Sequence, residues 1–313
     1  MKRGLVIGVL CVALATAGVA LAALLPEEPV LSSSRNERNP AADATGTTEV
    51  LAFTRSRSGF PNRYDAFVKT AGDPAVQLNV GGQGWTGGID YPMVVYQRIA
   101  RGQSDLFMYD LSDASRPPTA AGVNTSRWEW HPTMSGDWLL YGRDNTSNPT
   151  QRIVLHNHMT HEERVLESIT KATHYLQPDQ VNADWATYTK CAPNCNVFLY
   201  QISTAETTKL PRPMTDRPRQ QYAGGVSPDG AVYLARSGPR CGERVRIVRY
   251  DSARSDGTYG TTVASLPSGR DIAFAFLREQ FGGARDVDVL YDRVNCSTGR
   301  FDVYKVTDPP PGP

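Results

Sequence analysis

One phrase recurs in this chain and restricts its fold more than any other feature. The segments HPTMSGDWLLYG (residues 131–142) and QPDQVNADWATYT (residues 177–189) share a proline, a short turn, an acid followed by tryptophan, and an alternating apolar run with a tyrosine. The proline interrupts one strand, the turn reverses the chain, and the tryptophan begins the next strand. We interpret the phrase as the start of a structural unit that repeats along the chain.

Six short runs with two-residue alternation fit the second strand of such a unit. They are VLAFTRS (50–56), MVVYQRI (93–99), WLLYGRD (138–144), WATYTKC (185–191), VYLARSG (232–238) and VDVLYDR (287–293). Each is followed by a loop and a third strand, and no convincing helical period appears after residue 49. The pattern predicts an all-β chain: a six-bladed β-propeller over residues 49–308, with four antiparallel strands in each blade.

One of these units carries a family motif. VSPDGAVYLA (226–235) resembles the S-P-D-G turn of the TolB-like, WD40-like (PD40) propeller repeats, and YQISTAETTKL (200–210) resembles their third-to-fourth strand connection. The other units keep the proline and the turn but not the full motif. The resemblance implies a six-bladed ring around a central channel. It implies no particular chemistry, because such propellers serve both as binding platforms and as enzyme domains.

The ends of the chain differ from the repeats in composition. Lys2 and Arg3 precede an apolar run from Leu5 to Leu25, which predicts an N-terminal hydrophobic helix over residues 1–25. A cleaved signal peptide and an uncleaved membrane anchor fit this run equally well. Residues 26–48 are polar and are predicted to form a flexible linker, and residues 309–313 a disordered tail. The expected location is extracytoplasmic: secreted, periplasmic, or anchored to the outer side of the cytoplasmic membrane.

Four cysteines follow the apolar run, and an even number in an exported chain favours two disulfides. Cys191 and Cys195 flank the tip of the hairpin in the fourth unit. Cys241 and Cys296 hold the same place in units five and six, which a propeller sets side by side. We therefore expect the pairs 191–195 and 241–296. A zinc site would require the two cysteine pairs to converge. Their positions disfavour this, because units four and six are not neighbours.

No catalytic signature is present: there is no G-x-S-x-G elbow, no P-loop and no Rossmann fingerprint. We predict no catalytic residue, no metal and no cofactor. His156, His158 and His161 could form a surface metal site, although a polar hairpin end also explains them. Trp128 and Trp130 share one strand face, where core packing is favoured over stacking on a sugar.

Charge is balanced overall but not in its placement. The chain has 33 Lys and Arg against 32 Asp and Glu, a net charge of +1, which excludes a globally basic nucleic-acid binder. The hairpin loops between second and third strands collect arginines, and all of these loops reach one face of a propeller. The predicted binding residues on that face are Arg57, Arg63, Arg101, Arg152, Arg240, Arg244 and Arg300. The alternative is local pairing with Asp144, Glu243, Asp271 and Asp292.

These features predict a non-catalytic scaffold at the cell envelope that binds a protein or ligand, with the basic face as the candidate binding surface. The expected partner is an envelope protein or an anionic glycan or surface, not nucleic acid; the membrane is contacted through the N-terminal segment if that is uncleaved. The chain is expected to be a monomer. The alternative is an extracytoplasmic hydrolase or lyase acting on an envelope glycan at the channel mouth, which would require clustered acids or histidine there. A sensor of an external ligand is a third, weaker reading.

Overall fold

The structure, a computed structural model, describes residues 27–45, 48–144, 150–170, 174–191, 194–210, 220–238, 240–251, 261–279 and 287–308. These residues form 24 strands and one short 3-10 helix, η1 (Leu111–Asp113). The strands make six antiparallel sheets of four strands each, which confirms the predicted all-β propeller. We number the sheets as blades 1 to 6 and give the strands of each from the channel outwards.

Blade 1 consists of β2 (Glu37–Thr45), β3 (Thr48–Arg57), β4 (Phe60–Thr70) and β5 (Val76–Gln77). Blade 2 consists of β6 (Gln83–Asp90), β7 (Met93–Ala100), β8 (Gln103–Asp110) and β9 (Thr119–Ala120). Blade 3 consists of β10 (Trp128–Ser135), β11 (Trp138–Asp144), β12 (Thr150–Asn157) and β13 (Glu163–Thr170).

Blade 4 consists of β14 (Tyr175–Asn182), β15 (Trp185–Cys191), β16 (Cys195–Gln201) and β17 (Glu206–Lys209). Blade 5 consists of β18 (Gln220–Val226), β19 (Val232–Ser237), β20 (Arg246–Tyr250) and β21 (Thr261–Ser265). Blade 6 consists of β22 (Arg270–Glu279), β23 (Val287–Asn295), β24 (Phe301–Asp308) and, as its outermost strand, β1 (Glu28–Leu31).

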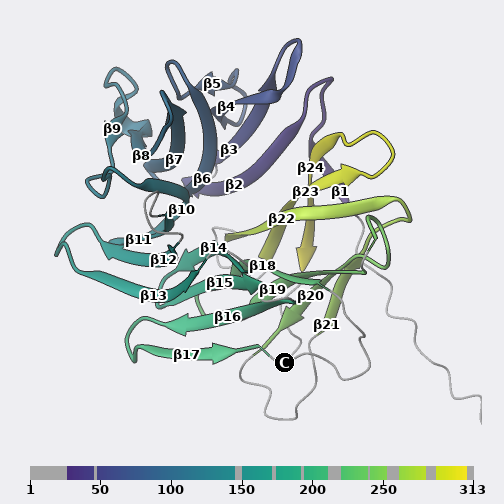
Figure 1. The fold of residues 1–313 in the computed structure, drawn as a ribbon. Helices are drawn as coiled ribbons and strands as arrows, with labels where there is room; N and C mark the ends of the chain where they lie inside the picture. The colour runs from purple at the N-terminus through teal and green to yellow at the C-terminus, as the bar shows by residue number, and fades with distance from the viewer. Residues whose placement is uncertain are drawn as a thin grey trace, which may run out of the picture.

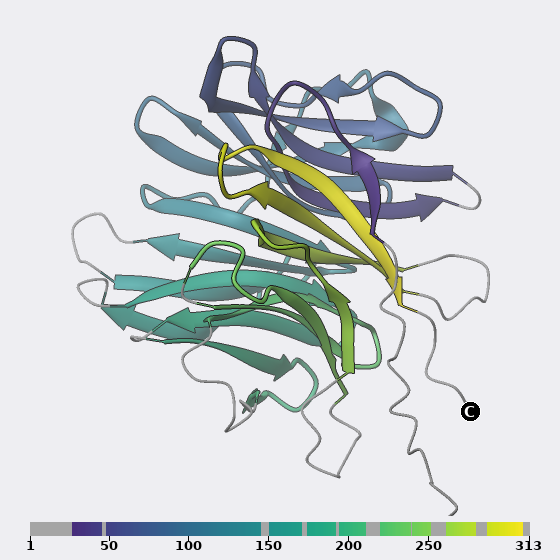
Figure 2. The ribbon, with the colours of Figure 1, turned by 90° about the vertical axis from the view of Figure 1, so that its right-hand side faces the viewer.

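The blades follow one another around a ring that closes on itself (Figure 1). Each of the six inner strands contacts the inner strands of both neighbouring blades, including β22 against β2. In Figure 2 the yellow strands of blade 6 lie beside the purple strands of blade 1. Strand β1 pairs with β24, so the first described strand completes the last blade. The ring is thus joined by chain segments from its two ends.

The core is divided among the joints between blades. The described residues form six apolar clusters, and each cluster spans two neighbouring blades. The tyrosines of the second strands, including Tyr141 and Tyr188, are at most 2% exposed in these clusters. Trp138 and Trp185, which begin the second strands of blades 3 and 4, pack against the clusters that join blade 3 to blade 4 and blade 4 to blade 5. The repeated phrase therefore encodes contacts between blades.

The prediction of a flexible linker over residues 26–48 is wrong, because β1 and β2 lie within it. The polar composition of this segment suggested a linker, but part of it belongs to β2, an inner strand of the ring. Glu37 is fully buried yet paired with Arg55 across the β2–β3 ladder, with Oε1 and Nη2 2.7 Å apart. Pro40 is tolerated because the register shifts between Arg38 and Ala41, a β-bulge in which a ladder donor is not needed. The propeller therefore begins before residue 49.

Two other predicted segments, the hydrophobic helix over residues 1–25 and the tail over residues 309–313, lie outside the described residues. Among the residues that are described, no helix has the length and apolar character needed to cross a membrane.

Candidate functional site

The two faces of the ring differ in the loops that they carry. The loops between second and third strands, together with the connections between blades, form one face, which we call the hairpin face. The turns between first and second strands and between third and fourth strands form the other, which we call the turn face. All seven predicted binding arginines lie in or next to hairpin-face loops, because each is at or near the junction of a second and a third strand.

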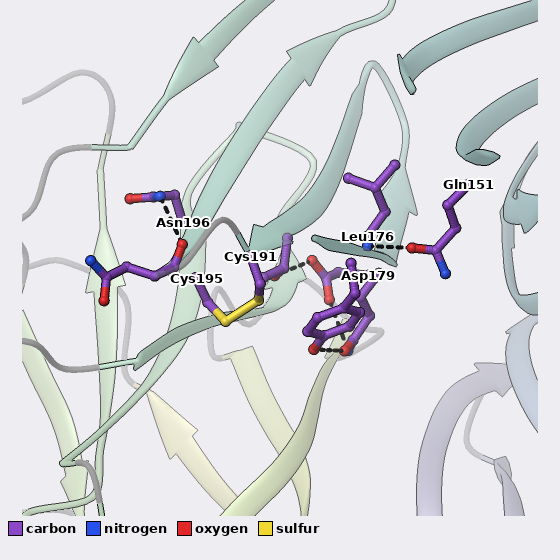
Figure 3. Close-up of a disulfide and its surroundings, with 10 residues drawn as sticks. Gln151, Leu176, Asp179, Cys191, Cys195 and Asn196 are labelled. Atoms are coloured by element: carbon purple, nitrogen blue, oxygen red, sulfur yellow. Dashed lines mark hydrogen bonds between the residues drawn. A yellow bond between two sulfur atoms is a disulfide. The ribbon is translucent and has the colours of Figure 1, made fainter. Parts of the chain in front are cut away.

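Two disulfides are located on the hairpin face, and both match the predicted pairing. Cys191 and Cys195 are cross-strand partners at the end of the β15–β16 hairpin, with Cα atoms 3.8 Å apart. Figure 3 shows this disulfide together with Asp179 of the inner strand β14. Cys241 and Cys296 link the hairpins of blades 5 and 6, with Cα atoms 5.8 Å apart. Both bonds therefore fix loops on the face that carries the arginines.

Two of the predicted arginines are neutralised by acids of their own blade. The Arg57 guanidinium forms an ion pair with Asp65 at 2.6 Å and also donates to the carbonyl of Gly82. Its hydrogen bond with Asp65 raises the pKa of Arg57 above its ordinary value. Arg300 pairs with Asp302 at 3.1 Å. These two cations are held by intramolecular partners.

The other five predicted arginines form no ion pair with any described residue. Arg63, Arg101, Arg240 and Arg244 are exposed, whereas Arg152 is half-buried on β12. The Arg63 guanidinium lies 5.2 Å from the centre of the Phe60 ring, which is itself exposed at the β3–β4 turn. The hairpin face thus presents four solvent-exposed guanidinium groups without an acidic partner among the residues that the structure describes.

The alternative prediction is that the arginines pair locally with Asp144, Glu243, Asp271 and Asp292. Local pairs do form, but mostly with other acids. Of the four acids, Asp292 contacts Arg38 at 3.4 Å, and the side chain of Asp271 lies outside the described ones. Arg143 is buried with Glu129 and Glu163, 3.2 and 2.8 Å away. Exposed acids lie on the turn face, among them Asp73, Asp137, Glu162, Glu206 and Asp229. The exposed acids named here therefore lie on the turn face, which also carries exposed cations such as Lys69 and Arg116.

The central channel is shaped by β-bulges. Every inner strand shifts its register against the second strand of its blade near its middle. The bulges fall at Asn39–Pro40, Gly87–Gly88, His131–Pro132, Asp179 directly after Pro178, Gly224–Gly225 and Ala273–Phe274. Asn39 and His131 have positive φ angles of 49° and 45°. A bulge redirects side chains that regular alternation would turn away, so polar groups from different blades meet at the axis.

Two small cavities of about 10 and 20 Å³ lie along the channel between the inner strands of blades 1 to 4. The first is lined by Asn39, Thr86, Gly87, His131, Pro132, Thr133, Pro178 and Asp179. A volume of this size holds about one water molecule. The part of the channel that these residues form is therefore nearly filled by the protein.

The two titratable groups in this lining are both shifted towards their neutral forms. Burial raises the pKa of Asp179 well above its usual range, although Thr189 and Gln177 donate to its carboxylate at 2.9 and 3.2 Å. Burial, with a smaller contribution from the charge of Arg38, lowers the pKa of His131 to about 4. Both shifts favour the neutral forms, so the lining is polar and carries less charge than its residue types alone would suggest.

The raised pKa of Asp179 predicts how its substitution changes stability with pH. Because the folded-state pKa is higher than the unfolded one, ionisation favours the unfolded chain as pH rises above about 4. The isosteric Asp179→Asn variant is therefore expected to have a higher Tm than the parent near pH 7, and the difference should shrink towards pH 4. Thermal unfolding across this pH range measures it. A difference that stays constant with pH would contradict the assignment of a buried, proton-binding carboxyl.

The two tryptophans considered from the sequence have structural roles, and two of the three histidines lie near each other. The Trp130 ring lies over Gly142, where an added Cβ would be 2.2 Å from the ring, and its Nε1 donates to Asp144 at 3.2 Å. Trp128 Nε1 donates to the carbonyl of Gly102 in the neighbouring blade. His156 and His161 lie 6.2 Å apart between ring centres. No cluster of three or more His, Cys, Asp or Glu arranged to bind a metal occurs in the described ranges.

Sequence reasoning missed the channel residues. Asn39 lies in the segment predicted as a linker, and Asp179 lies in the repeated phrase, where it counts among the acids of the turns. Aligning the sequences of the six inner strands at their middles would have revealed these residues. A proline or a pair of glycines lies at or next to the bulge in five of the six strands.

No family model matches the chain, and no curated protein matches it in sequence. Solved structures share its fold. TolB from Acinetobacter baumannii superposes with a TM-score of 0.53 and 12% identity, covering 83% of this chain and 63% of that one. A neuraminidase-like protein from A/bat/Guatemala/164/2009 gives a TM-score of 0.55 and 8% identity, covering 92% and 96%. A prolyl endopeptidase gives 0.52 and 11% identity, covering 89% and 43%.

The matched lengths differ among these proteins. The chain spans less than two thirds of TolB and less than half of the prolyl endopeptidase, but nearly all of the neuraminidase-like protein. At such low identities the likeness shows the fold alone, and the same fold occurs in proteins with different descriptions. The chain has the six-bladed propeller fold that its S-P-D-G turn predicted, the fold of TolB.

Proposed function

We propose that the chain is an extracytoplasmic scaffold at the cell envelope, and that its hairpin face binds an acidic partner without catalysis. The observation that carries the proposal is the group of exposed guanidinium groups that lack an acidic partner among the described residues: Arg63, Arg101, Arg240 and Arg244. Unpaired, solvated cations on one face attract an anionic surface and increase the rate of encounter with it.

The disulfides support the proposed location. Structural disulfides persist in oxidising compartments and are rare in the cytosol. The propeller carries two, and a fold like that of TolB is consistent with the envelope. The predicted export segment over residues 1–25 belongs to the same proposal.

The direction of β1 supports the choice of face. Glu28 pairs with Lys305 and Leu31 with Val303, so β1 runs towards the hairpin face. A membrane anchor or other tether before residue 27 would then join the ring away from that face. The hairpin face of a tethered propeller would remain accessible to a partner.

The channel lining supports binding more than catalysis. Its one carboxyl in the described cavity, Asp179, is held by Thr189 and Gln177 and favours its protonated form. Hydrolysis of a glycan uses two carboxylic groups on either side of the scissile bond. We therefore place the partner on the loops around the channel, where both the arginines and the disulfides lie.

Charge reversal on one face at a time tests the proposal. The Arg63→Glu, Arg101→Glu double variant is expected to bind an acidic envelope partner at least about tenfold more weakly at low salt, with a smaller loss at high salt because exposed charges are screened. Retention on a sulfated polysaccharide column and recovery of partners from envelope extract provide the measurements.

The matched control reverses two cations near the turn face. The Lys69→Glu, Arg116→Glu variant changes the net charge equally and affects exposed side chains. It should retain most of the binding of the parent. Equal losses in the two variants would show that net charge decides retention, and unchanged binding by the hairpin-face variant would overturn the proposal.

A further inference from the structure

Arg38 occupies the channel mouth on the hairpin face. It is the second residue of β2 and pairs in register with Thr54, close to the hairpin end of blade 1. Its guanidinium carbon lies 5.8 Å from the Trp85 ring of blade 2 and 4.1 Å from the Phe301 ring of blade 6. Because β2 is the innermost strand of blade 1, we infer that a side chain near both blade 2 and blade 6 passes the channel edge of blade 1 at its hairpin end. Arg38 is thus directed into the mouth.

The hydrogen-bonding capacity of Arg38 is only partly used. Its Nε contacts Oδ2 of Asp292 at 3.4 Å, a long contact for a charged pair. Neither Nη atom forms a hydrogen bond with any residue in the described part of the chain. The side chain keeps 20% of its surface exposed, so solvent or a ligand can reach it. Four N–H donors of a planar fork are therefore available at the mouth.

The next residue supplies an unused acceptor. Asn39 is 3% exposed, and its Oδ1 has no hydrogen-bond partner within the described residues. Asn39 lines the smaller of the two channel cavities together with Thr86 and His131. Adjacent residues of a regular strand point to opposite sides, but the bulge between Arg38 and Ala41 breaks this alternation. A buried acceptor left without a donor is costly, and the cavity beside it has room for a group about the size of one water molecule, such as the hydroxyl of a ligand.

The local charge restricts what can bind. Arg38 contributes one positive charge, and Asp292 already lies beside it. A dianionic phosphate would be poorly balanced by such a site, whereas a single carboxylate suits the planar fork, which can donate two parallel hydrogen bonds to it. The guanidinium carbon lies 4.1 Å from the centre of the Phe301 ring and 5.8 Å from that of Trp85, and contact with a ring face leaves the N–H edge of the guanidinium available.

We propose that the channel mouth binds a small organic acid whose carboxylate is held by Arg38 and whose adjacent hydroxyl or amino group donates to Asn39. The site uses residues of the inner strand and is separate from the exposed arginines of the proposed function. An α-hydroxy or α-amino acid, or the last residue of a peptide, presents the required pair of groups.

Glycolate, acetate and inorganic phosphate are the probes that test this proposal. Glycolate and acetate differ only in the hydroxyl, so the full chain should bind glycolate more tightly than acetate, and phosphate more weakly than either. Titration followed by tryptophan fluorescence and by heteronuclear NMR reports binding, since Trp85 lies beside Arg38. No binding of glycolate, or tighter binding of phosphate, would overturn the proposal.

Three variants assign the contacts. Arg38→Met should weaken the binding of glycolate and of acetate at least about tenfold. If this variant fails to fold, Arg38→Lys keeps the positive charge near Asp292 and should also lose most of the binding. Asn39→Ala should weaken glycolate severalfold and leave acetate nearly unchanged. Arg116→Met, an exposed residue on the turn face, should bind all probes like the parent. Glycolate binding that survives both Arg38 substitutions would overturn the assignment, whatever happens to the binding of acidic partners by the hairpin face.

Discussion

A chain that starts at residue 32 is expected to be less stable than one that starts at Pro26 by about 3–5 kcal/mol in free energy of unfolding. The shorter chain lacks β1, the outermost strand of blade 6. Leu31, 9% exposed, would no longer fill the cluster that joins blade 6 to blade 1. Glu27 would no longer accept hydrogen bonds from Tyr291 and Arg293 at 2.5 and 2.6 Å. Urea-induced unfolding followed by tryptophan fluorescence measures the difference.

Two point variants separate closure of the ring from general loss of apolar contacts. Leu31→Ala should cost about 2–3 kcal/mol, because it leaves a cavity at the closing joint. Val76→Ala alters β5, the outermost strand of blade 1, where the side chain is 50% exposed, and should change stability by less than about 0.5 kcal/mol. If the chain that starts at residue 32 unfolds at the same urea concentration as the chain that starts at Pro26, β1 does not close the ring.

The strands that could be predicted from the sequence are those buried on both sides. The second and third strands of all six blades lie at the positions predicted from alternation and from β-branched residues. Their sequence signal is clear because each of these strands lies between two apolar clusters. Strand β2 could not be found in this way. It carries Glu37, Asn39 and Pro40, which are suited to a channel wall with a bulge but are also typical of a linker.

The disulfides were predictable because their argument depends on topology alone. Once six repeats are assigned, equivalent hairpins of consecutive blades are neighbours, and Cys241 and Cys296 follow. Ion pairing depends on finer geometry. Arg57 is paired because Asp65 lies beside it on β4, near the β3–β4 turn, whereas Arg101, in the corresponding turn of blade 2, has no acid within reach among the described residues. Residue type alone could not distinguish these two arginines.

Replacing both Cys241 and Cys296 by alanine is expected to lower the free energy of unfolding by about 4 kcal/mol, against about 2 kcal/mol for the same change at Cys191 and Cys195. The reason is loop length: the first bond joins residues 55 positions apart and the second joins residues 4 apart, so the first removes more freedom from the unfolded chain. Denaturant unfolding of the two double variants under oxidising conditions provides the comparison.

The position of the longer bond adds a prediction about where the ring opens. Blades 5 and 6 are also joined near the turn face, where Asp308 accepts from Tyr233 at 2.9 Å and from Arg249 at 2.6 Å. The disulfide holds the hairpin-face side of the same joint. Without it, amides of β22 and β23 should exchange with solvent faster than those of β11, while removal of the Cys191–Cys195 bond should affect exchange only near its own hairpin. The two bonds lie on the same face and differ chiefly in the length of chain that they enclose. If the Cys241, Cys296 variant loses less stability than the Cys191, Cys195 variant, chain entropy does not govern the stability of this joint.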